Sequence, residues 1–139
     1  MIKPFHFILM FIGLTIVVWV ISDNNRSLLT TEGKLTDIDN IFFQDSLVLW
    51  DYSLVLFYVD SSDVCRKMEE NLIRLKNETG YTHIHKINAD LYPDLVHKYN
   101  ISGVPNILLL KKGVDHGRIM GVVSFSNIKM IYNRHRVDM

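Results

Sequence analysis

The chain has 139 residues, which is enough for one domain with an N-terminal extension. Its 15 acidic and 15 basic residues give a formal charge of zero, and the absence of a basic stripe argues against a nucleic-acid-binding protein. The single cysteine excludes an internal disulfide and any metal site built from several cysteines.

The first 22 residues contain the apolar run "ILMFIGLTIVVWVI", which Lys3 precedes and no charge interrupts. A membrane-spanning helix needs ~20 apolar residues and the core of a signal peptide ~7–15, so this run lies between the two lengths. We therefore interpret residues 1–22 as a hydrophobic helix that is either a signal peptide or a signal-anchor transmembrane segment. Both alternatives predict that the rest of the chain is carried across a membrane.

Three N-x-S/T sequons, at Asn25, Asn77 and Asn100, are in agreement with a glycoprotein of the secretory pathway. The expected location is the membrane or lumen of the endoplasmic reticulum, or the extracellular face. The polar residues 23–34 are predicted to form a linker, and residues 35–139 the folded domain.

The first half of this domain predicts a helix, a strand and a second helix. Thr36 is the predicted N-cap of the first helix, because apolar residues follow it at helical spacing. The apolar run 53–60 has the length of a strand buried on both faces. Residues 63–80 are predicted to form a helix, with one apolar stripe made by Cys65, Met68, Leu72 and Leu75.

The second half continues with a strand at 82–90, a short helix at 92–101 and a strand at 106–113. Gly113 and Gly117 are expected to bracket a hairpin into a last strand, and residues 124–138 predict a closing helix. The order predicts an α/β fold, with a mixed central sheet between helices on both faces.

Two segments carry a resemblance to a known family. The chain reads "SSDVCRK" where the strand meets the helix and "YNISGVPNILLLKKG" some forty residues later. Both resemble the thioredoxin superfamily, in which W-C-x-x-C-K stands at this corner and a cis-proline faces it. The resemblance covers residues 35–139 and implies a thioredoxin-like fold. The chain also resembles the thioredoxin-related, protein disulfide isomerase-like proteins of the secretory pathway that carry an altered corner motif.

The corner motif departs from the family pattern in ways that bear on activity. Ser62 stands where the family has its attacking cysteine, and Cys65 where it has the resolving one. Thiol–disulfide exchange by that route needs both thiols, so the resemblance implies that dithiol oxidoreductase activity is lost. The family's buried acid would fall at Leu56, which leaves Lys86, a common partner of that acid, without it.

Cys65 has two interpretations. It is either a small buried apolar side chain of the helix stripe or a reactive single thiol that forms mixed or intermolecular disulfides. Pro105 is expected to shape its loop. The resemblance further implies a cis Val104–Pro105 bond near Ser62 and Cys65, with the backbone of Val104 turned toward the corner, where an extended peptide can pair with it.

His83 and His85 share one face of a predicted strand, but no third ligand lies nearby. We expect them to be solvated on an exposed face, with no metal site and no cofactor.

Together these features predict a redox-degenerate thioredoxin-like domain that binds a protein or peptide client near a membrane, to which its N-terminal segment attaches it. This prediction leans against an enzyme. The alternative is a monothiol oxidoreductase or redox sensor with an intermolecular disulfide partner at Cys65, and a third possibility is a structural subunit of a membrane complex.

Overall fold

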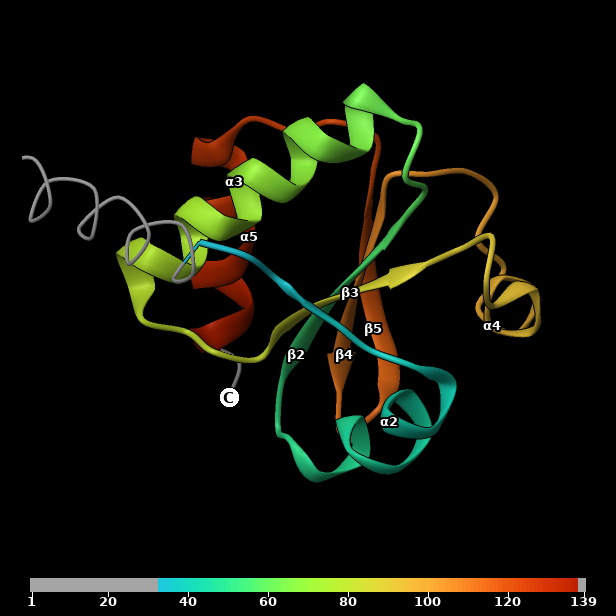
Figure 1. Ribbon diagram of the computed structural model, residues 1–139. Helices are drawn as coiled ribbons and strands as arrows, with labels where there is room; N and C mark the ends of the chain where they lie inside the picture. The colour runs from blue at the N-terminus through green and yellow to red at the C-terminus, as the bar shows by residue number, and fades with distance from the viewer. Residues whose placement is uncertain (1–32, 138–139) are drawn as a thin grey trace, which may run out of the picture. The chain divides into compact units, whose positions relative to one another are not determined.

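The computed structural model describes residues 33–137, in which five strands form one sheet in the order β1-β3-β2-β4-β5 (Figure 1). The elements are β1 (Thr36–Asp37), α2 (Asn40–Asp45), the 3-10 helix η1 (Leu47–Leu49), β2 (Ser53–Tyr58), α3 (Asp63–Thr79), β3 (Ile84–Asn88), α4 (Pro93–Lys98), β4 (Asn106–Lys111), β5 (Val114–Met120) and α5 (Phe125–Val137). The predicted α/β fold with a mixed sheet is confirmed.

The central strand β2 explains why the sheet is mixed. It pairs with β3 in parallel and with β4 in antiparallel orientation. All six of its residues are buried, as a continuous apolar run predicts for a strand covered on both faces.

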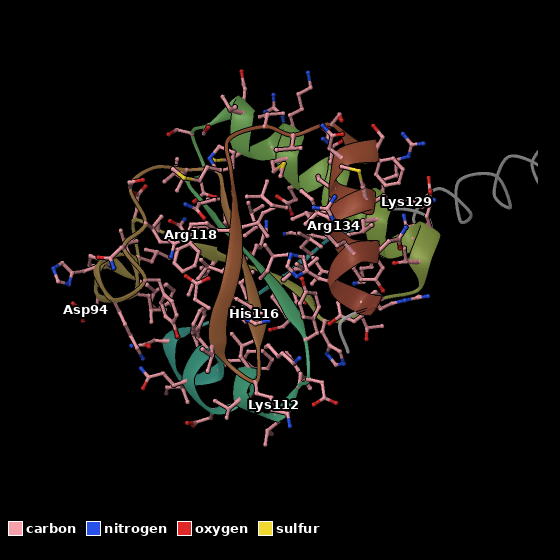
Figure 2. All side chains as sticks on the ribbon, turned by 180° about the vertical axis from the view of Figure 1, so that it is seen from behind. Asp94, Lys112, His116, Arg118, Lys129 and Arg134 are labelled. Atoms are coloured by element: carbon pink, nitrogen blue, oxygen red, sulfur yellow. The ribbon has the colours of Figure 1, made fainter. Side chains whose placement is uncertain are left out.

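The hairpin between β4 and β5 is also confirmed, although its glycines differ from the prediction. Gly113 makes the turn, at a φ of 76° that glycine adopts without steric cost. Gly117 lies within β5 instead of marking an end of the hairpin. The pairing is irregular between Leu109 and Leu110, and β5 carries His116 and Arg118 along the edge of the sheet (Figure 2).

Two apolar cores fill the space on the two faces of the sheet. On one face α3 and α5 contribute side chains such as Leu72 and Tyr132, and on the other α2, η1 and α4 contribute Phe43, Leu47 and Leu95. Helices therefore cover both faces, as the element order predicts.

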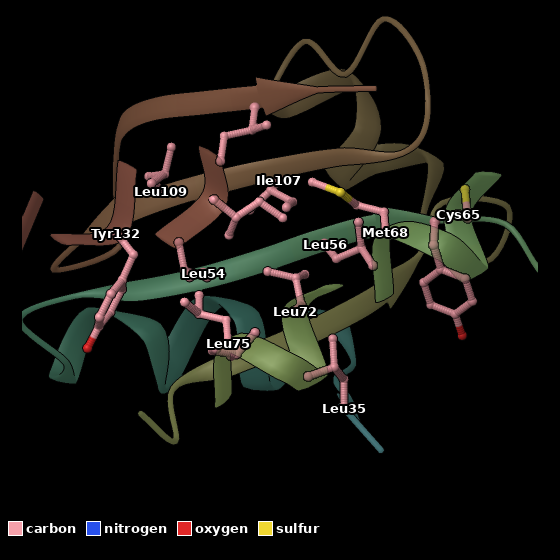
Figure 3. Close-up of a cluster of buried hydrophobic side chains, with 14 of the residues drawn as sticks. Leu35, Leu54, Leu56, Cys65, Met68, Leu72, Leu75, Ile107, Leu109 and Tyr132 are labelled. Carbon is pink, nitrogen blue, oxygen red and sulfur yellow. The ribbon is translucent and has the colours of Figure 1, made fainter. Parts of the chain in front are cut away.

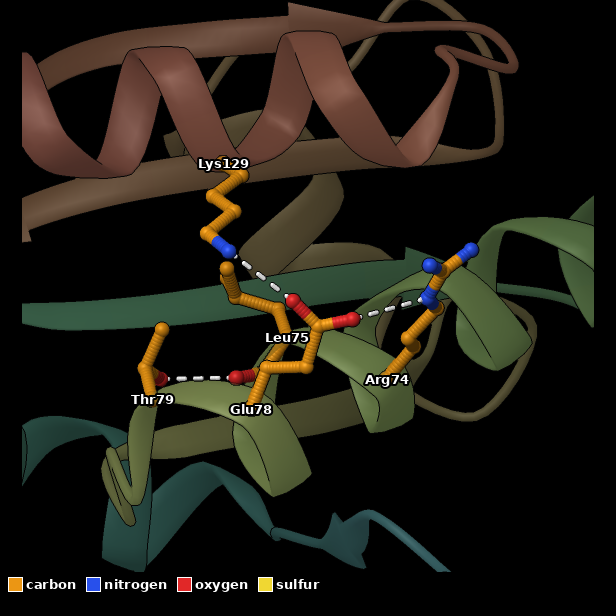
Figure 4. A network of polar contacts seen from close by, with 5 residues as sticks. All are labelled: Arg74, Leu75, Glu78, Thr79 and Lys129. Atoms are coloured by element: carbon orange, nitrogen blue, oxygen red, sulfur yellow. Dashed lines mark hydrogen bonds and ion pairs between the residues drawn. The ribbon is translucent and has the colours of Figure 1, made fainter.

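The helix α3 ends as its sequence predicts and lies beside α5. Gly80 follows it at a φ of 68°, and its N–H donates to the Lys76 carbonyl. Glu78 joins the two helices at their surface, where it pairs with Lys129 of α5 at 2.9 Å and with Arg74 of its own helix at 3.0 Å (Figure 4).

The predicted start of the first helix at Thr36 is wrong. Thr36 and Asp37 form β1, which pairs in parallel with β3, and the helix begins at Asn40. Asp39 is its N-cap, accepting a hydrogen bond from the Phe42 N–H at 2.7 Å. Pairing with β3 extends the chain at the position where local propensity favours a helix.

The N-terminal predictions lie outside the described residues, except for the last two residues of the linker. The hydrophobic helix at 1–22 and the linker at 23–34 therefore stay predictions. Between residues 33 and 137, no helix combines the length and apolar character that a bilayer crossing requires.

Candidate functional site

A strand–helix corner carries the predicted site residues Ser62 and Cys65. The strand β2 ends at Tyr58, and Ser62 closes the connection to α3 as its N-cap. The Ser62 hydroxyl oxygen accepts a hydrogen bond from the Cys65 N–H at 3.2 Å. The first N–H groups of a helix have no partner within the helix, and this hydroxyl supplies one for α3. The side chain at the position of the family's nucleophile therefore has a structural role.

The thiol of Cys65 lies inside the protein. Cys65 is free and only 2% exposed, and it belongs to the same apolar cluster as Met68 and Leu72 (Figure 3). A thiol must reach its substrate to attack it or to be attacked. In this conformation Cys65 is placed as a small buried apolar side chain, which agrees with the first of its two interpretations.

The loop before β4 brings the predicted residues Val104 and Pro105 to the same end of the sheet. The bond between them is cis. Pro105 is buried, and its carbonyl accepts a hydrogen bond from the Gly121 N–H at 2.9 Å. Val104 is half-buried and packs against both cores, including the one that holds Cys65.

The main chain of Val104 is available for pairing. It precedes β4, and none of the backbone hydrogen bonds within residues 33–137 involves its N–H or its carbonyl. A partly exposed peptide unit without an internal partner can pair with an added extended segment.

Exposed apolar side chains surround this end of the sheet. They are Val64 (51% exposed), Leu91 (70%), Met120 (56%) and Val122 (40%), and we call them the apolar rim. Val64 lies in the first turn of α3, after β2, Leu91 follows β3, and Met120 and Val122 lie at and after the end of β5. These strand ends lie at the beginning of β4, so the sheet topology places all four residues at the end of the sheet where Val104 precedes β4.

Lys86 has acidic partners other than the family's acid. Leu56 is fully buried at the position of that acid, as the sequence indicates. Its ammonium nitrogen lies 2.9 Å from a Glu69 carboxylate oxygen and 3.6 Å from Asp37. The Glu69 carboxylate on α3 thus pairs with the lysine that lacks the family's acid.

Tyr58 completes this polar cluster. The Lys86 ammonium lies 4.5 Å from the centre of its ring, and its hydroxyl donates to Asp37 at 2.8 Å. Burial, together with the hydrogen bond to Asp37, raises the pKa of Tyr58 above its ordinary value. The cluster therefore ties β1, β2, β3 and α3 together by charge and hydrogen bonding.

The two histidines of the β3 region are not solvated as predicted. His85 is buried, and both histidine rings lie against Trp50, at centroid distances of 4.2 Å for His83 and 4.9 Å for His85. Burial lowers the pKa of His85 to about 4, with smaller contributions from His83 and Lys76. Neither ring nitrogen of His85 has a hydrogen-bond partner among the described residues.

A surface cavity of about 330 Å³ opens beside this stack. Its lining consists of Leu49, Trp50, Asp51, Tyr52, Tyr81 and His83. It lies where β2 and β3 begin, at the opposite end of these strands from the corner. The described part of the chain holds no group of three or more His, Cys, Asp or Glu side chains arranged for a metal ion.

The predicted glycosylation sites are spread over the surface. Asn77 is exposed in the last turns of α3, and Asn100 is exposed directly after α4. Neither lies at the corner, and Asn25 is outside the described residues.

Glu69 and Trp50 are the neighbours that sequence reasoning missed. In the sequence Glu69 is one of several charged residues on a surface helix. The signal that could have identified it is its spacing of four residues from Cys65, which places it on the buried side of that helix. For Trp50 no pattern in the sequence indicates the histidine stack.

Comparison with known proteins agrees with the fold. The sequence model of the Thioredoxin family matches residues 36–133. A thioredoxin of Chlamydia caviae is 27% identical over 96 residues, covering 69% of this chain and 89% of that protein. The protein disulfide isomerase-like 5-2 of Oryza sativa subsp. japonica is 29% identical over 87 residues, which are 60% of this chain but 21% of the rice protein.

Solved structures show the same arrangement of elements. Oxidized mitochondrial thioredoxin 3 from Saccharomyces cerevisiae superimposes with a TM-score of 0.63 at 23% identity, covering 71% of this chain and 94% of that one. A mutant thioredoxin from Halobacterium salinarum gives a TM-score of 0.64, also at 23% identity, over 72% of this chain and 88% of that one.

Proposed function

The chain belongs to the thioredoxin family, and from its altered corner we propose that it binds extended segments of client proteins without a covalent bond. The observation that carries this proposal is the apolar rim around the unpaired backbone of Val104. The corner offers no accessible thiol for disulfide exchange, because Ser62 carries a hydroxyl that caps α3 and Cys65 is buried. Exposed apolar side chains therefore support non-covalent binding of a polypeptide better than thiol exchange.

The apolar rim supports this proposal on energetic grounds. Covering apolar surface contributes ~25 cal/mol per Å², and main-chain pairing fixes the direction of an extended segment. The surface is small and the segment loses chain entropy on docking, so we expect weak and reversible binding. Such binding suits a chaperone-like module that meets many clients.

Single substitutions in the apolar rim test the proposal. We expect Leu91→Asp and Val122→Asp to weaken binding of a fluorescein-labelled, cysteine-free extended apolar peptide by about tenfold, measured by anisotropy. The matched controls are Leu49→Asp and Val114→Asp, because these side chains are 79% and 66% exposed at the opposite end of the sheet. Equal effects of rim and control substitutions, or no binding by the unaltered protein, would refute the proposal.

We also propose that the domain works in the secretory pathway, attached by residues 1–22 or released after their removal. The apolar run and the three sequons support this location, and Asn77 and Asn100 are exposed where a glycan can be accommodated. The clients would then be secretory-pathway proteins, as the resemblance to isomerase-like proteins with an altered corner suggests.

Expression of the full chain in a eukaryotic cell tests this location. The expected product loses mass on treatment with an N-glycosidase, and the combined variant with Gln at Asn25, Asn77 and Asn100 shows no such loss. A domain that carries no glycan and is open to protease added on the cytosolic side would contradict it.

The monothiol alternative requires a different conformation of the corner. Cys65 would have to become accessible before it could form a mixed disulfide, and its burial gives that function no support. Client capture that disappears on adding a reductant, and in the Cys65→Ala variant, would replace our proposal by this alternative.

A further inference from the structure

The buried side chain of Asn88 joins two loops at the corner. Its amide nitrogen donates to the Asp60 carboxylate at 2.8 Å, and its amide oxygen accepts from the Asp90 N–H at 2.9 Å. One loop precedes α3 and the other leads to Leu91 of the apolar rim. Asn88 thus holds Asp60 and Asp90 beside the surface on which we propose that clients dock.

These two carboxylates lack basic partners. Both side chains are exposed, and among the ion pairs of residues 33–137 none involves Asp60 or Asp90. Asp63, by contrast, pairs with Arg66 at 2.7 Å. Lys86, four residues before Asp90, pairs with Glu69 and Asp37 instead. Two negative charges therefore remain uncompensated next to an apolar surface.

We infer that the docked segment is an extended polypeptide in which a lysine or arginine adjoins apolar residues. This inference rests on the proposed function and specifies its ligand. The apolar rim holds apolar side chains without regard to charge. Asp60 and Asp90 accept charge-assisted hydrogen bonds from a cation beside them, and they steer basic segments toward the corner before contact.

A pair of peptides that differ in one side chain tests the inference. Both are extended, cysteine-free, apolar and fluorescein-labelled, with a central arginine in one and its neutral isostere citrulline in the other. We expect the full-length protein to bind the arginine peptide about 1.5-fold to fivefold more tightly, the range for exposed ion pairs. Added NaCl should reduce this preference, since salt screens exposed charges.

Isosteric variants then locate the charge. Asp60→Asn and Asp90→Asn should each reduce the preference for arginine and leave citrulline-peptide binding unchanged. The Asp60→Asn side chain keeps an oxygen that can accept the hydrogen bond from Asn88. The matched control is Asp51→Asn, because Asp51 is an exposed aspartate at the opposite end of β2.

The outcomes separate the two proposals. Equal binding of the two peptides by the unaltered protein overturns the inference and leaves the docking function standing. An equal loss in Asp51→Asn also overturns it, because the preference would then arise from overall charge. If neither peptide binds, the proposed function fails and the inference fails with it.

Discussion

Ser62, at the position of the family's attacking cysteine, is the N-cap of α3. Its hydroxyl accepts the Cys65 N–H and so caps α3, a contribution of ~0.5–2 kcal/mol at typical helix starts. Cys65, three residues on, turns into the core. The two positions of the motif have thus become a helix cap and a packing residue.

The buried thiol should therefore be unreactive while the protein is folded. We expect a thiol reagent to label Cys65 only at the rate at which the first turn of α3 opens, and rapidly in denaturant, because the sulfur is covered by apolar side chains. Mass spectrometry of the labelled protein over time measures both rates. The protein should also show no Cys65-dependent reduction of insulin disulfides. Rapid labelling of the folded protein, or such turnover, would contradict this.

His85 makes the stability of the domain depend on pH. Burial lowers its pKa from the ordinary 6.5 to about 4 in the folded state, so the unfolded chain binds a proton more readily. Stability is therefore highest above pH 6.5 and declines as pH falls from about 6.5 to about 4. Urea midpoints across this range measure the decline.

A phenylalanine at position 85 provides the comparison for this prediction. His85→Phe keeps an aromatic ring against Trp50 and Phe42 and removes the titrating group. The decline between pH 6.5 and 4 should be smaller in this variant. An unchanged pH profile would show that other groups cause the decline.

At the level of elements, the domain relies on contacts that join distant segments. The Lys86 side chain is 7% exposed and brings the interior strand β3 into contact with α3 through Glu69, and with β1 through Asp37. The pairs of Glu78 with Lys129 of α5 and with Arg74 of its own helix are similar in distance but more exposed. We expect the buried pairs to contribute more to stability than the exposed pairs, because water screens the exposed pairs.

Neutralising one acid in each set measures this difference. Glu69→Gln leaves the buried ammonium with Asp37 alone, and we expect a loss of roughly 2–3 kcal/mol in unfolding free energy, somewhat below the usual cost of removing one partner from a buried pair. The matched control Glu78→Gln should change it by less than ~1 kcal/mol. Urea denaturation measures both.

A double variant completes this test. Glu69→Leu combined with Lys86→Met should recover much of the stability lost in Glu69→Gln, since an apolar pair avoids burying charge. Equal effects of Glu69→Gln and Glu78→Gln would show that the Lys86 cluster contributes no more than a surface pair.

For the whole molecule, the sequence predicts those parts whose signals are local. One apolar stripe and a terminal glycine predict the helix α3, and an uninterrupted apolar run predicts β2. The two-residue β1 could not be predicted, because its extended form depends on β3, far along the chain. The burial of His85 depends likewise on Trp50, which packs across from another segment.

The candidate site divides in the same way. The positions of Ser62, Cys65 and Pro105 follow from motif spacing, and their common end of the sheet follows from the strand order. The partners of Lys86 could not be predicted, because a glutamate on a charged helix gives no sign of which side chain turns inward. The hydrogen bonds of Asn88 to Asp60 and Asp90 could not be predicted either, because only the fold brings these two loops together.

The edge strand β5 has a consequence for aggregation of the domain. Among the described residues it pairs only with β4, so its outer main chain could template further strands and start a cross-β aggregate. The ion pair between Asp115 and Arg118 places charge on this strand, and the irregular register beside Leu109 increases its twist. Both features make this edge a poor template for amyloid-like growth.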